Sequence, residues 1–270
     1  MNNKKLPENF IKIFGTAGAR MAQSKQVRAS GGAWLSLADT NLLFDPGPGT
    51  LVHCWAGDKP FNPAELDAIV LSHRHLDHSN DFNVMVESMV EGGFNPHGVA
   101  AAPADAMEGD EPIFFRYLRP TVDRVETLKE GYSFRVGGLT VTTPIRHKHP
   151  VETYGLVFQA EGINVSVVTD TRYFSGLIDA YRGADLLILN VTFIKPFHGS
   201  RAYHLSMEEI KPLITEIRPR MTLLTHFGTS ILSSDPDKLA NNLGEELAAK
   251  VVAASDGIVV DLDAMDIWKG

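Results

Sequence analysis

A short run of metal-binding side chains, His73-Arg74-His75-Leu76-Asp77-His78, constrains the fold of this chain more than any other segment. The run directly follows the apolar segment 66–72, which has the composition of a buried strand that ends in a loop. Imidazole nitrogens and carboxylate oxygens are ligands that zinc, iron and manganese accept in proteins. Because a strand end holds such side chains on a rigid element, the pattern predicts a metal centre. Three histidines and one aspartate are enough to begin two metal sites.

The bulk composition narrows the class of protein. The chain has 270 residues, enough to bury a large core, and 44% of them are hydrophobic, which excludes intrinsic disorder. The net charge of -8 argues against a broad basic face that grips extended nucleic acid. The single cysteine, Cys54, permits neither an intrachain disulfide nor a thiolate zinc site. Because no signal segment or membrane-spanning stretch is evident, we expect a cytoplasmic enzyme without a membrane partner.

No linker or internal repeat is visible, so we expect one domain over residues 1–270. Apolar and alternating patterns predict strands in both halves of the chain. The expected strands cover 10–14, 33–38, 41–45, 66–71, 133–136, 139–143, 154–160, 164–169, 186–191 and 221–225, followed by short strands up to residue 268.

Helical spacing predicts helices at 79–91, 206–217 and 235–250, with Ser206 and Glu209 forming a capping box. The stretch 92–111 is rich in Gly, Pro and Ala and ends acidic, so we expect an irregular excursion there. Strands and helices in each half favour an α/β (α+β) sandwich with helices outside two central sheets.

The remaining metal ligands should follow other strands. His149 lies in a loop before an expected strand, Asp170 ends the strand 164–169, and His226 ends the strand 221–225. Polar ligands placed repeatedly just past apolar strands are what a site at one rim of a sheet sandwich requires. His147 is the local rival of His149.

The order of these residues resembles the metallo-β-lactamase superfamily, and the resemblance covers most of the chain. The segments 15–18, 43–47 and 168–171 are similar to the ribonuclease Z and cyclic phosphodiesterase branch, as is the spacing from His149 to Gly155. The resemblance implies the four-layer αβ/βα sandwich of the metallo-β-lactamase fold. It also favours His149 over His147 as the ligand, which leaves His147 outside the ligand set or facing solvent.

The resemblance further implies a dinuclear centre that most often holds zinc, with iron or manganese as alternatives. One metal would be bound by three histidines and the other by an aspartate and two histidines, with Asp170 bridging both. The implied ligands are His73, His75 and His149 for the first metal, and Asp77, His78 and His226 for the second.

Two further segments are assigned structural roles. Asp45 is expected to cap the turn at Gly47 and to brace a metal ligand. Residues 15–18 suggest a phosphate-binding loop. However, no Lys-Ser/Thr pair follows the turn, and we expect no helix after it, although a phosphate-binding loop needs both. A tight turn under the active site is therefore the preferred interpretation.

Such a centre would perform hydrolysis. Two divalent ions, two carboxylates and a bridging hydroxide leave about one net positive charge, which favours anionic substrates, with the hydroxide as nucleophile. Asp77 and His204 are the candidate catalytic residues. His204 precedes Leu-Ser, as does a histidine of ribonuclease Z relatives to which an acid or transition-state-stabilising role is given. A helix-entry histidine without a chemical role is an equal alternative. The relatives have a glutamate where this chain has Asn190, and an amide can orient a histidine without keeping it protonated.

The expected substrate is small, because the basic arm of transfer-RNA-processing relatives is missing. Acidic residues of the excursion would repel the phosphates of a nucleic-acid chain. They are Asp105, Glu108, Asp110 and Glu111. Basic residues that could instead line the mouth of the site are Arg116, Arg119, Lys195 and Arg201.

We therefore predict a metal-dependent hydrolase, and we favour a phosphodiesterase that acts on a small or cyclic phosphodiester. An ester, lactone or β-lactam hydrolase is the alternative, with Tyr154 or Tyr173 as oxyanion donor. A transfer-RNA 3′-processing endonuclease and a non-enzymatic scaffold are less favoured. Phe114, Phe115 and Tyr117 either pack in the core, which we expect for at least two of them, or form a lid or a homodimer contact.

Overall fold

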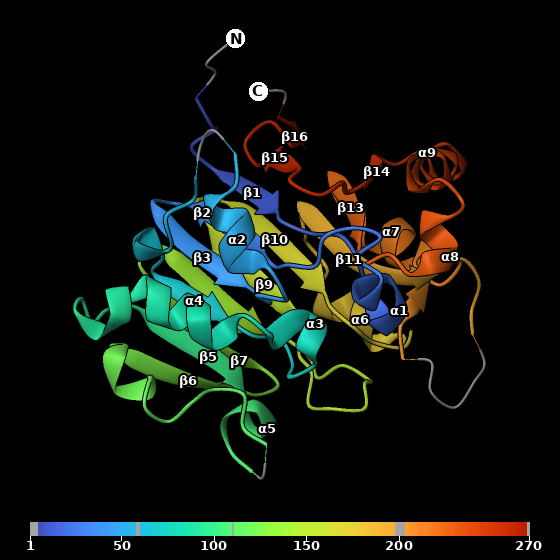
Figure 1. The fold of residues 1–270 in the computed structure, drawn as a ribbon. Helices are drawn as coiled ribbons and strands as arrows, with labels where there is room; N and C mark the ends of the chain where they lie inside the picture. The colour runs from blue at the N-terminus through green and yellow to red at the C-terminus, as the bar shows by residue number, and fades with distance from the viewer. Residues whose placement is uncertain (1–4, 58–59, 110, 198–202, 269–270) are drawn as a thin grey trace.

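A computed structural model describes residues 5–57, 60–109, 111–197 and 203–268 of the chain. Two mixed sheets of eight strands each lie face to face at its centre (Figure 1). The first sheet has the strand order β16-β15-β1-β2-β3-β4-β5-β6. Its strands are β1 (Phe10–Ile13), β2 (Ala33–Leu37), β3 (Thr40–Phe44), β4 (Ala68–Val70), β5 (Val99–Pro103), β6 (Arg124–Leu128), β15 (Val259–Asp261) and β16 (Asp266–Ile267).

The second sheet has the order β14-β13-β11-β10-β9-β8-β7, and β12 pairs with β11 beside this path. Its strands are β7 (Tyr132–Val136), β8 (Leu139–Thr143), β9 (Leu156–Ala160), β10 (Ile163–Val168), β11 (Leu186–Phe193), β12 (Leu205–Ser206), β13 (Met221–Thr225) and β14 (Val251–Ala253).

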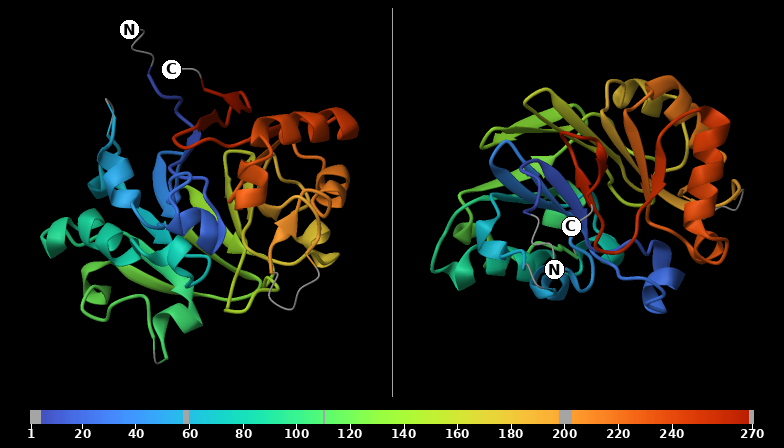
Figure 2. Two further views of the ribbon diagram at one scale, coloured as in Figure 1. Left: turned by 45° about the vertical axis from the view of Figure 1, so that its right-hand side comes forward. Right: turned by 90° about the horizontal axis from the view of Figure 1, so that it is seen from above.

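Helices flank the outer faces of both sheets (Figure 2). The α-helices are α1 (Ala19–Ser24), α2 (Thr50–Trp55), α3 (Leu76–Ser79), α4 (Phe82–Met89), α5 (Ala104–Met107), α6 (Gly176–Ala180), α7 (Lys211–Ile217), α8 (Thr229–Leu232) and α9 (Pro236–Leu247). Single 3₁₀ turns occur at Pro63–Glu65, Glu91–Gly93 and Arg119–Thr121.

Three clusters of buried apolar side chains pack between the layers. One joins the facing sides of the two sheets and includes Phe44 and Phe158, whose ring centroids are 5.5 Å apart. A second lies between the first sheet and α4, where Phe82 and Met85 are buried. A third lies between the second sheet and helices such as α7. The expected four-layer sandwich, with helices outside two central sheets, is therefore confirmed.

Both sheets change from antiparallel to parallel pairing along their width. In the first sheet β3, β4, β5 and β6 are parallel, and in the second β10, β11, β13 and β14 are parallel. The carboxyl ends of parallel strands lie at one edge of a sheet, which is where α/β proteins build their sites. The polar residues just past β3, β4, β10 and β13 are therefore collected at one rim.

The prediction that residues 92–111 form an irregular excursion is wrong for part of that stretch. It contains β5, which lies between β4 and β6 in the first sheet, and the short helix α5. β6 was not expected either. The segment Ala100–Ala102 has weak strand propensity, but small buried side chains suit an interior parallel strand, and the sheet on both sides of it decides the conformation.

Helix starts also differ from expectation, most clearly at α7 and α1. Ser206 N donates to Oε2 of Glu209 at 3.0 Å, and Glu209 N donates to Oγ of Ser206 at 3.3 Å, so the capping-box bonds exist. The helix α7 nevertheless begins only at Lys211, because Ser206 pairs with β11 as part of β12. In addition, α1 does follow the turn at 15–18, where no helix was expected.

The expectation that at least two of three aromatic residues pack in the core is wrong. Phe114 is fully buried, but Phe115 is 50% exposed and Tyr117 is 65% exposed. The backbone N–H of Phe115 donates to Oδ1 of Asn83 in α4, which holds the segment across the outside of that helix.

Among the described residues, no helix is both long and apolar enough to cross a membrane.

Candidate metal centre

The loop after β4 is held from below by Asp45, the residue that follows β3. Oδ1 of Asp45 accepts from the backbone N–H of Ser72 at 2.6 Å, and Oδ2 accepts from Ser72 Oγ at 2.7 Å and from His78 Nδ1 at 3.0 Å. The predicted brace to a candidate ligand is therefore present. The turn at Gly47 is bonded by the backbone carbonyl of Asp45 (2.7 Å), not by the carboxylate as expected.

The second sheet supplies three candidate ligands from separate strand ends. His149 lies in the loop between β8 and β9, Asp170 follows β10 and His226 follows β13. His226 adopts a left-handed backbone with φ of 61°, a conformation that costs free energy in a residue other than glycine and is often found at functional sites. This turn directs the side chain toward the donor cluster.

The turn at 15–18 lies directly against His226, as predicted. A side chain at Gly18 would place its Cβ 2.2 Å from the carbonyl oxygen of His226, so only glycine fits there. Gly18 N donates to the carbonyl of Phe227, and Phe227 N donates to the carbonyl of Thr16. The turn is thus bonded to the chain after β13, which favours the structural role over a phosphate-binding loop.

All seven predicted ligands meet in one cluster. Their ligand atoms form two groups, in each of which the atoms lie within 4.8 Å of one another. One group is His73, His75, His149 and Asp170, and the other is Asp77, His78, His226 and Asp170. Asp170 belongs to both groups, as in the division of donors that the family resemblance implies. Asp45 forms a third set with His73 and His78, but its carboxylate is already bonded to Ser72 and His78.

Hydrogen bonds on the outer side of the cluster leave imidazole lone pairs facing inward. His78 Nδ1 donates to Asp45, and His149 Nδ1 donates to the carbonyl of Tyr203 at 3.1 Å. The Thr192 hydroxyl donates to the backbone carbonyl of His226, so its oxygen is free to accept from Nδ1 of His226 at 3.1 Å. In the neutral form of each of these three rings, the lone pair then lies on Nε2.

Most of the inward nitrogens face other imidazole rings. Nε2 of His78 lies 3.1 Å from Nε2 of His226, and Nε2 of His149 lies 2.9 Å from Nδ1 of His75. Nε2 of His73 is buried without a hydrogen-bond partner among the described residues. A proton on one nitrogen of each pair, or a cation between the two, would satisfy both nitrogens. The donor set therefore fits divalent metal ions that prefer nitrogen and oxygen ligands.

The carboxylates and imidazoles shift each other's pKa. Burial alone would raise the pKa of Asp170, but the neighbouring His226, His204 and His78 outweigh it and hold that pKa well below its usual range. Burial likewise opposes charge on His78, yet Asp170 and the other nearby carboxylates raise its pKa. Either a proton on His78 or a bound cation would compensate the buried negative charge of Asp170.

Burial has the opposite result at other histidines of the cluster. It lowers the pKa of His149 to about 4 despite the charge of Asp170, and it holds the pKa of His73 well below the usual value. Both rings are therefore neutral at pH 7, which is the form of histidine that binds metal.

His147 lies outside the donor cluster and is buried, so solvent exposure, one of its two expected fates, is excluded. Its Nε2 is 2.7 Å from the hydroxyl of Tyr181, and burial lowers its pKa to about 3. A Cβ at Gly155 would lie 1.6 Å from the same hydroxyl. Gly155 is therefore required by the contact between His147 and Tyr181.

His204 and Asn190 both contact Asp170. Nε2 of His204 lies 3.0 Å from Oδ2 of Asp170, and Nδ2 of Asn190 donates to Oδ1 at 3.0 Å. The Asn190 amide was expected to orient His204, but it orients Asp170 instead. Asp170 counteracts the effect of burial on His204 and raises its pKa.

Several site residues were not singled out in the sequence. Ser72 and Thr192 fix candidate ligands from outside the cluster, and Tyr203 does so through its carbonyl. Thr192 lies two residues beyond Asn190 in β11, so strand alternation places both on one face and could have indicated its role. Arg172 lies with its guanidinium 4.2 Å from the Tyr203 ring centroid.

Other predicted residues do not join the cluster. The hydroxyl of Tyr154 donates to Glu152 at 2.7 Å, and the Arg119 guanidinium binds Glu108 and the carbonyl of Phe114. Arg201 and Asp110 fall outside the described residues. The acidic excursion does lie beside the motif, since Nε of Arg74 is 3.5 Å from Asp105 and its Nη1 is 3.9 Å from Glu111.

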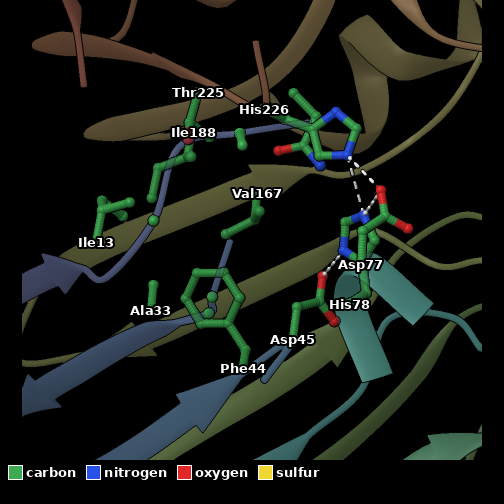
Figure 3. A pocket seen from close by; sticks show the side chains of 15 residues that line it. Ile13, Ala33, Phe44, Asp45, Asp77, His78, Val167, Ile188, Thr225 and His226 are labelled. Atoms are coloured by element: carbon green, nitrogen blue, oxygen red, sulfur yellow. Dashed lines mark hydrogen bonds and ion pairs between the residues drawn. The ribbon is translucent and has the colours of Figure 1, made fainter. Parts of the chain in front are cut away.

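A cavity separates the donor cluster from the apolar core between the sheets (Figure 3). Asp45, Asp77, His78 and His226 border it on the polar side, where dashed lines mark their contacts. Side chains of both sheets border it on the other side. They are Ile13, Ala33, Phe44, Val167 and Ile188. The cluster therefore lies at the rim of the inter-sheet core, where surrounding structure limits the movement of its ligands.

This fold and rim cluster define the class of metallo-β-lactamase-fold proteins. The chain belongs to the beta-lactamase superfamily, because its residues 40–227 match the family's domain. YhfI of Bacillus subtilis, described as a probable metallo-hydrolase, is 28% identical over 217 residues, covering 80% of this chain and 86% of YhfI. The predicted family resemblance is thereby confirmed.

Solved structures show the same fold. The crystal structure of YhfI matches with a TM-score of 0.75 and 22% identity, covering 93% of this chain and 98% of YhfI. Human tRNase Z, short form, matches with a TM-score of 0.67 and 16% identity over 94% of this chain and 99% of that chain. A diphosphatase from the PhnP family matches with a TM-score of 0.64 and 17% identity, covering 96% of this chain and 100% of that chain.

Proposed function

We propose that this metal-dependent hydrolase of the metallo-β-lactamase fold is a dinuclear phosphodiesterase for a small anionic phosphodiester. The observation that carries the proposal is the position of Asp170. Its carboxylate lies within 3.9 Å of His149, 3.6 Å of His73, 3.5 Å of His78 and 3.4 Å of His226. One carboxylate shared by two groups of donors is the arrangement that a two-ion site requires.

His73, His75 and His149 would hold one ion, Asp77, His78 and His226 the other, and Asp170 both. When bound, two divalent ions supply an activated water and offset the negative charge that develops on the substrate. Zinc suits the nitrogen-rich donor set, and iron and manganese are alternatives. The two aspartates offset only part of the charge of two such ions, which favours an anionic substrate.

His204 is the candidate proton donor to the leaving group. Its Nε2 touches Asp170, while 18% of its side chain remains accessible, so the ring lies between the cluster and solvent. Asp170 raises the pKa of His204, which increases the protonated fraction near neutral pH. Asn190 keeps the other oxygen of Asp170 occupied and thereby fixes the carboxylate that His204 contacts.

The surroundings of the cluster favour a small substrate over a nucleic-acid chain. Arg74, within the ligand motif, is paired with Asp105 and Glu111. These carboxylates offset its charge beside the site and would repel a row of phosphates. The ester-hydrolase alternative gains no support from Tyr154, because its hydroxyl is bonded to Glu152.

Metal-loaded protein should be tested against bis-p-nitrophenyl phosphate, p-nitrophenyl acetate and nitrocefin. We expect turnover of the phosphodiester, and we expect His204→Ala to lower kcat by about 10²–10⁴-fold while metal content is unchanged. His53→Ala, outside the donor cluster, is the control and should retain full activity.

Turnover of the ester or nitrocefin alone would overturn the proposal in favour of the other hydrolase. Tight binding of transfer RNA with a steep salt dependence would instead favour the endonuclease.

A further inference from the structure

Two phenylalanine rings extend from the donor cluster to the surface. Phe193 is the last residue of β11, and its ring meets the ring of His204 edge to face, with centroids 6.1 Å apart and an interplanar angle of 79°. The ring of Phe197 stacks on Phe193 at 5.7 Å and 24°. His204 itself stacks on His226 at 5.5 Å and 18°. The stacked pair is thus only one residue removed from a candidate metal ligand.

Phe197 contributes little to the core. Its side chain is 62% exposed, and it is not part of any of the three apolar clusters. Exposing a large aromatic ring forgoes the free energy that burial would contribute. Lys195, two residues before it, is also exposed, so a positive charge adjoins the rings in sequence. An apolar ring face with a nearby cation suits a ligand that combines a planar ring with a negative charge.

We propose that Phe193 and Phe197 form a stacking subsite for a planar aromatic group of the substrate, such as a nucleobase. This inference rests on the proposed function and names its substrate class, a phosphodiester of a nucleoside. His204 lies between the cluster and the rings, so the subsite takes the side of the substrate that carries the leaving oxygen.

The chemistry of the step is ordinary hydrolysis. The oxygen of water forms a new bond to phosphorus, the bond from phosphorus to the leaving oxygen breaks, and the leaving oxygen gains a proton. With a 2′,3′-cyclic nucleotide, the leaving oxygen belongs to the ribose that carries the base. Stacking on phenylalanine rings tolerates any base, since every base has a π-face, so we expect little discrimination among bases.

The test compares two cyclic phosphodiesters, 2′,3′-cyclic AMP and glycerol 1,2-cyclic phosphate, of which only the first carries a ring. Phe197→Ala should raise KM for cyclic AMP about tenfold, leave kcat near its original value, and leave KM for the glycerol compound unchanged. Phe197→Trp should restore the original KM. A matched control is Phe115→Ala, since Phe115 is exposed and stacked on Tyr117 at 6.0 Å but, among the described residues, makes no ring contact with a histidine of the cluster.

A binding measurement separates this inference from the proposed function. By calorimetry, the metal-loaded protein should bind AMP about tenfold more tightly than ribose 5-phosphate, and Phe197→Ala should abolish the difference. If no phosphodiester is turned over but this difference is found, the proposed function fails while the subsite stands. Equal binding of the two compounds by the original protein, or a preference that survives Phe197→Ala, would overturn the subsite.

Discussion

The two sheets contribute to the donor cluster in different ways. The first sheet supplies His73, His75, Asp77 and His78 from one short segment after β4 that ends in α3, with Asp45 beneath it. The second sheet supplies its donors one at a time, from the ends of separate strands and from the loop before β9. The topology of the two sheets is similar, so the difference lies in how donors are distributed along the chain.

This difference sets what each half of the cluster depends on. The donors of the first half keep their spacing mainly through local backbone, including the backbone bonds of α3 to His75, and through the bonds of Asp45 to Ser72 and His78. The donors of the second half are aligned by the parallel register of β10, β11 and β13, in which Leu189 pairs with both Val168 and Leu224. The second half therefore depends more on correct tertiary packing.

Removal of the shared ligand should have the largest effect. Asp170→Ala takes away the one carboxylate that both groups contain, so we expect loss of at least one of two ions and a fall in phosphodiester turnover of about a thousandfold or more. Metal content is measured by elemental analysis beside kcat/KM. Asp179→Ala removes a surface aspartate paired with Arg182 and is the control. A variant that retains both ions and full turnover would show that Asp170 is not the shared ligand.

Changes to the outer hydrogen bonds should have intermediate effects that compare the two halves directly. Asp45→Asn removes the charge that faces His78 but suits the left-handed backbone at this position (φ 49°), while Thr192→Val removes the hydroxyl beside His226. Each should weaken metal binding by about 10–100-fold.

We expect Asp45→Asn to be the more severe of the two, because Asp45 also bonds twice to Ser72. Chelator competition gives the affinity of each variant. A larger loss in Thr192→Val would contradict the view that the loop of the first half depends on Asp45.

The smallest effect on the protein is expected at Cys54 in α2, which is buried in the apolar cluster against the first sheet. Burial raises the pKa of this thiol to about 12, despite the opposing charge of Lys12. A raised pKa in the folded state means that the contribution to stability is present below the unfolded value of 9.0 and is lost as pH rises toward 12. A thiol reagent should therefore leave the native protein unlabelled at pH 8 and label it fully in guanidinium chloride. Rapid native labelling would mean that α2 opens readily.

Much of the cluster could be predicted because its donors have distinctive chemistry and follow apolar strands. The run at 73–78 is local, and His149, Asp170 and His226 stand next to recognisable strand patterns. The partner of Asn190 could not be predicted, because strand alternation gives the face of a side chain but not which atom it meets. β5 was missed because alanine has weak strand propensity, and the neighbouring strands supply the stabilisation that the segment lacks.

The sequence alone determined the donor types, the loop that carries four of them, and the family to which the chain belongs. The tertiary structure decided which donors share a group, which nitrogen of each ring faces inward, and that Asp170 lies at the centre. The physical reason is distance along the chain. Nε2 of His78 and Nε2 of His226 are 3.1 Å apart although the residues are 148 positions apart, and only the packing of two sheets with their parallel strand ends at one rim brings them together.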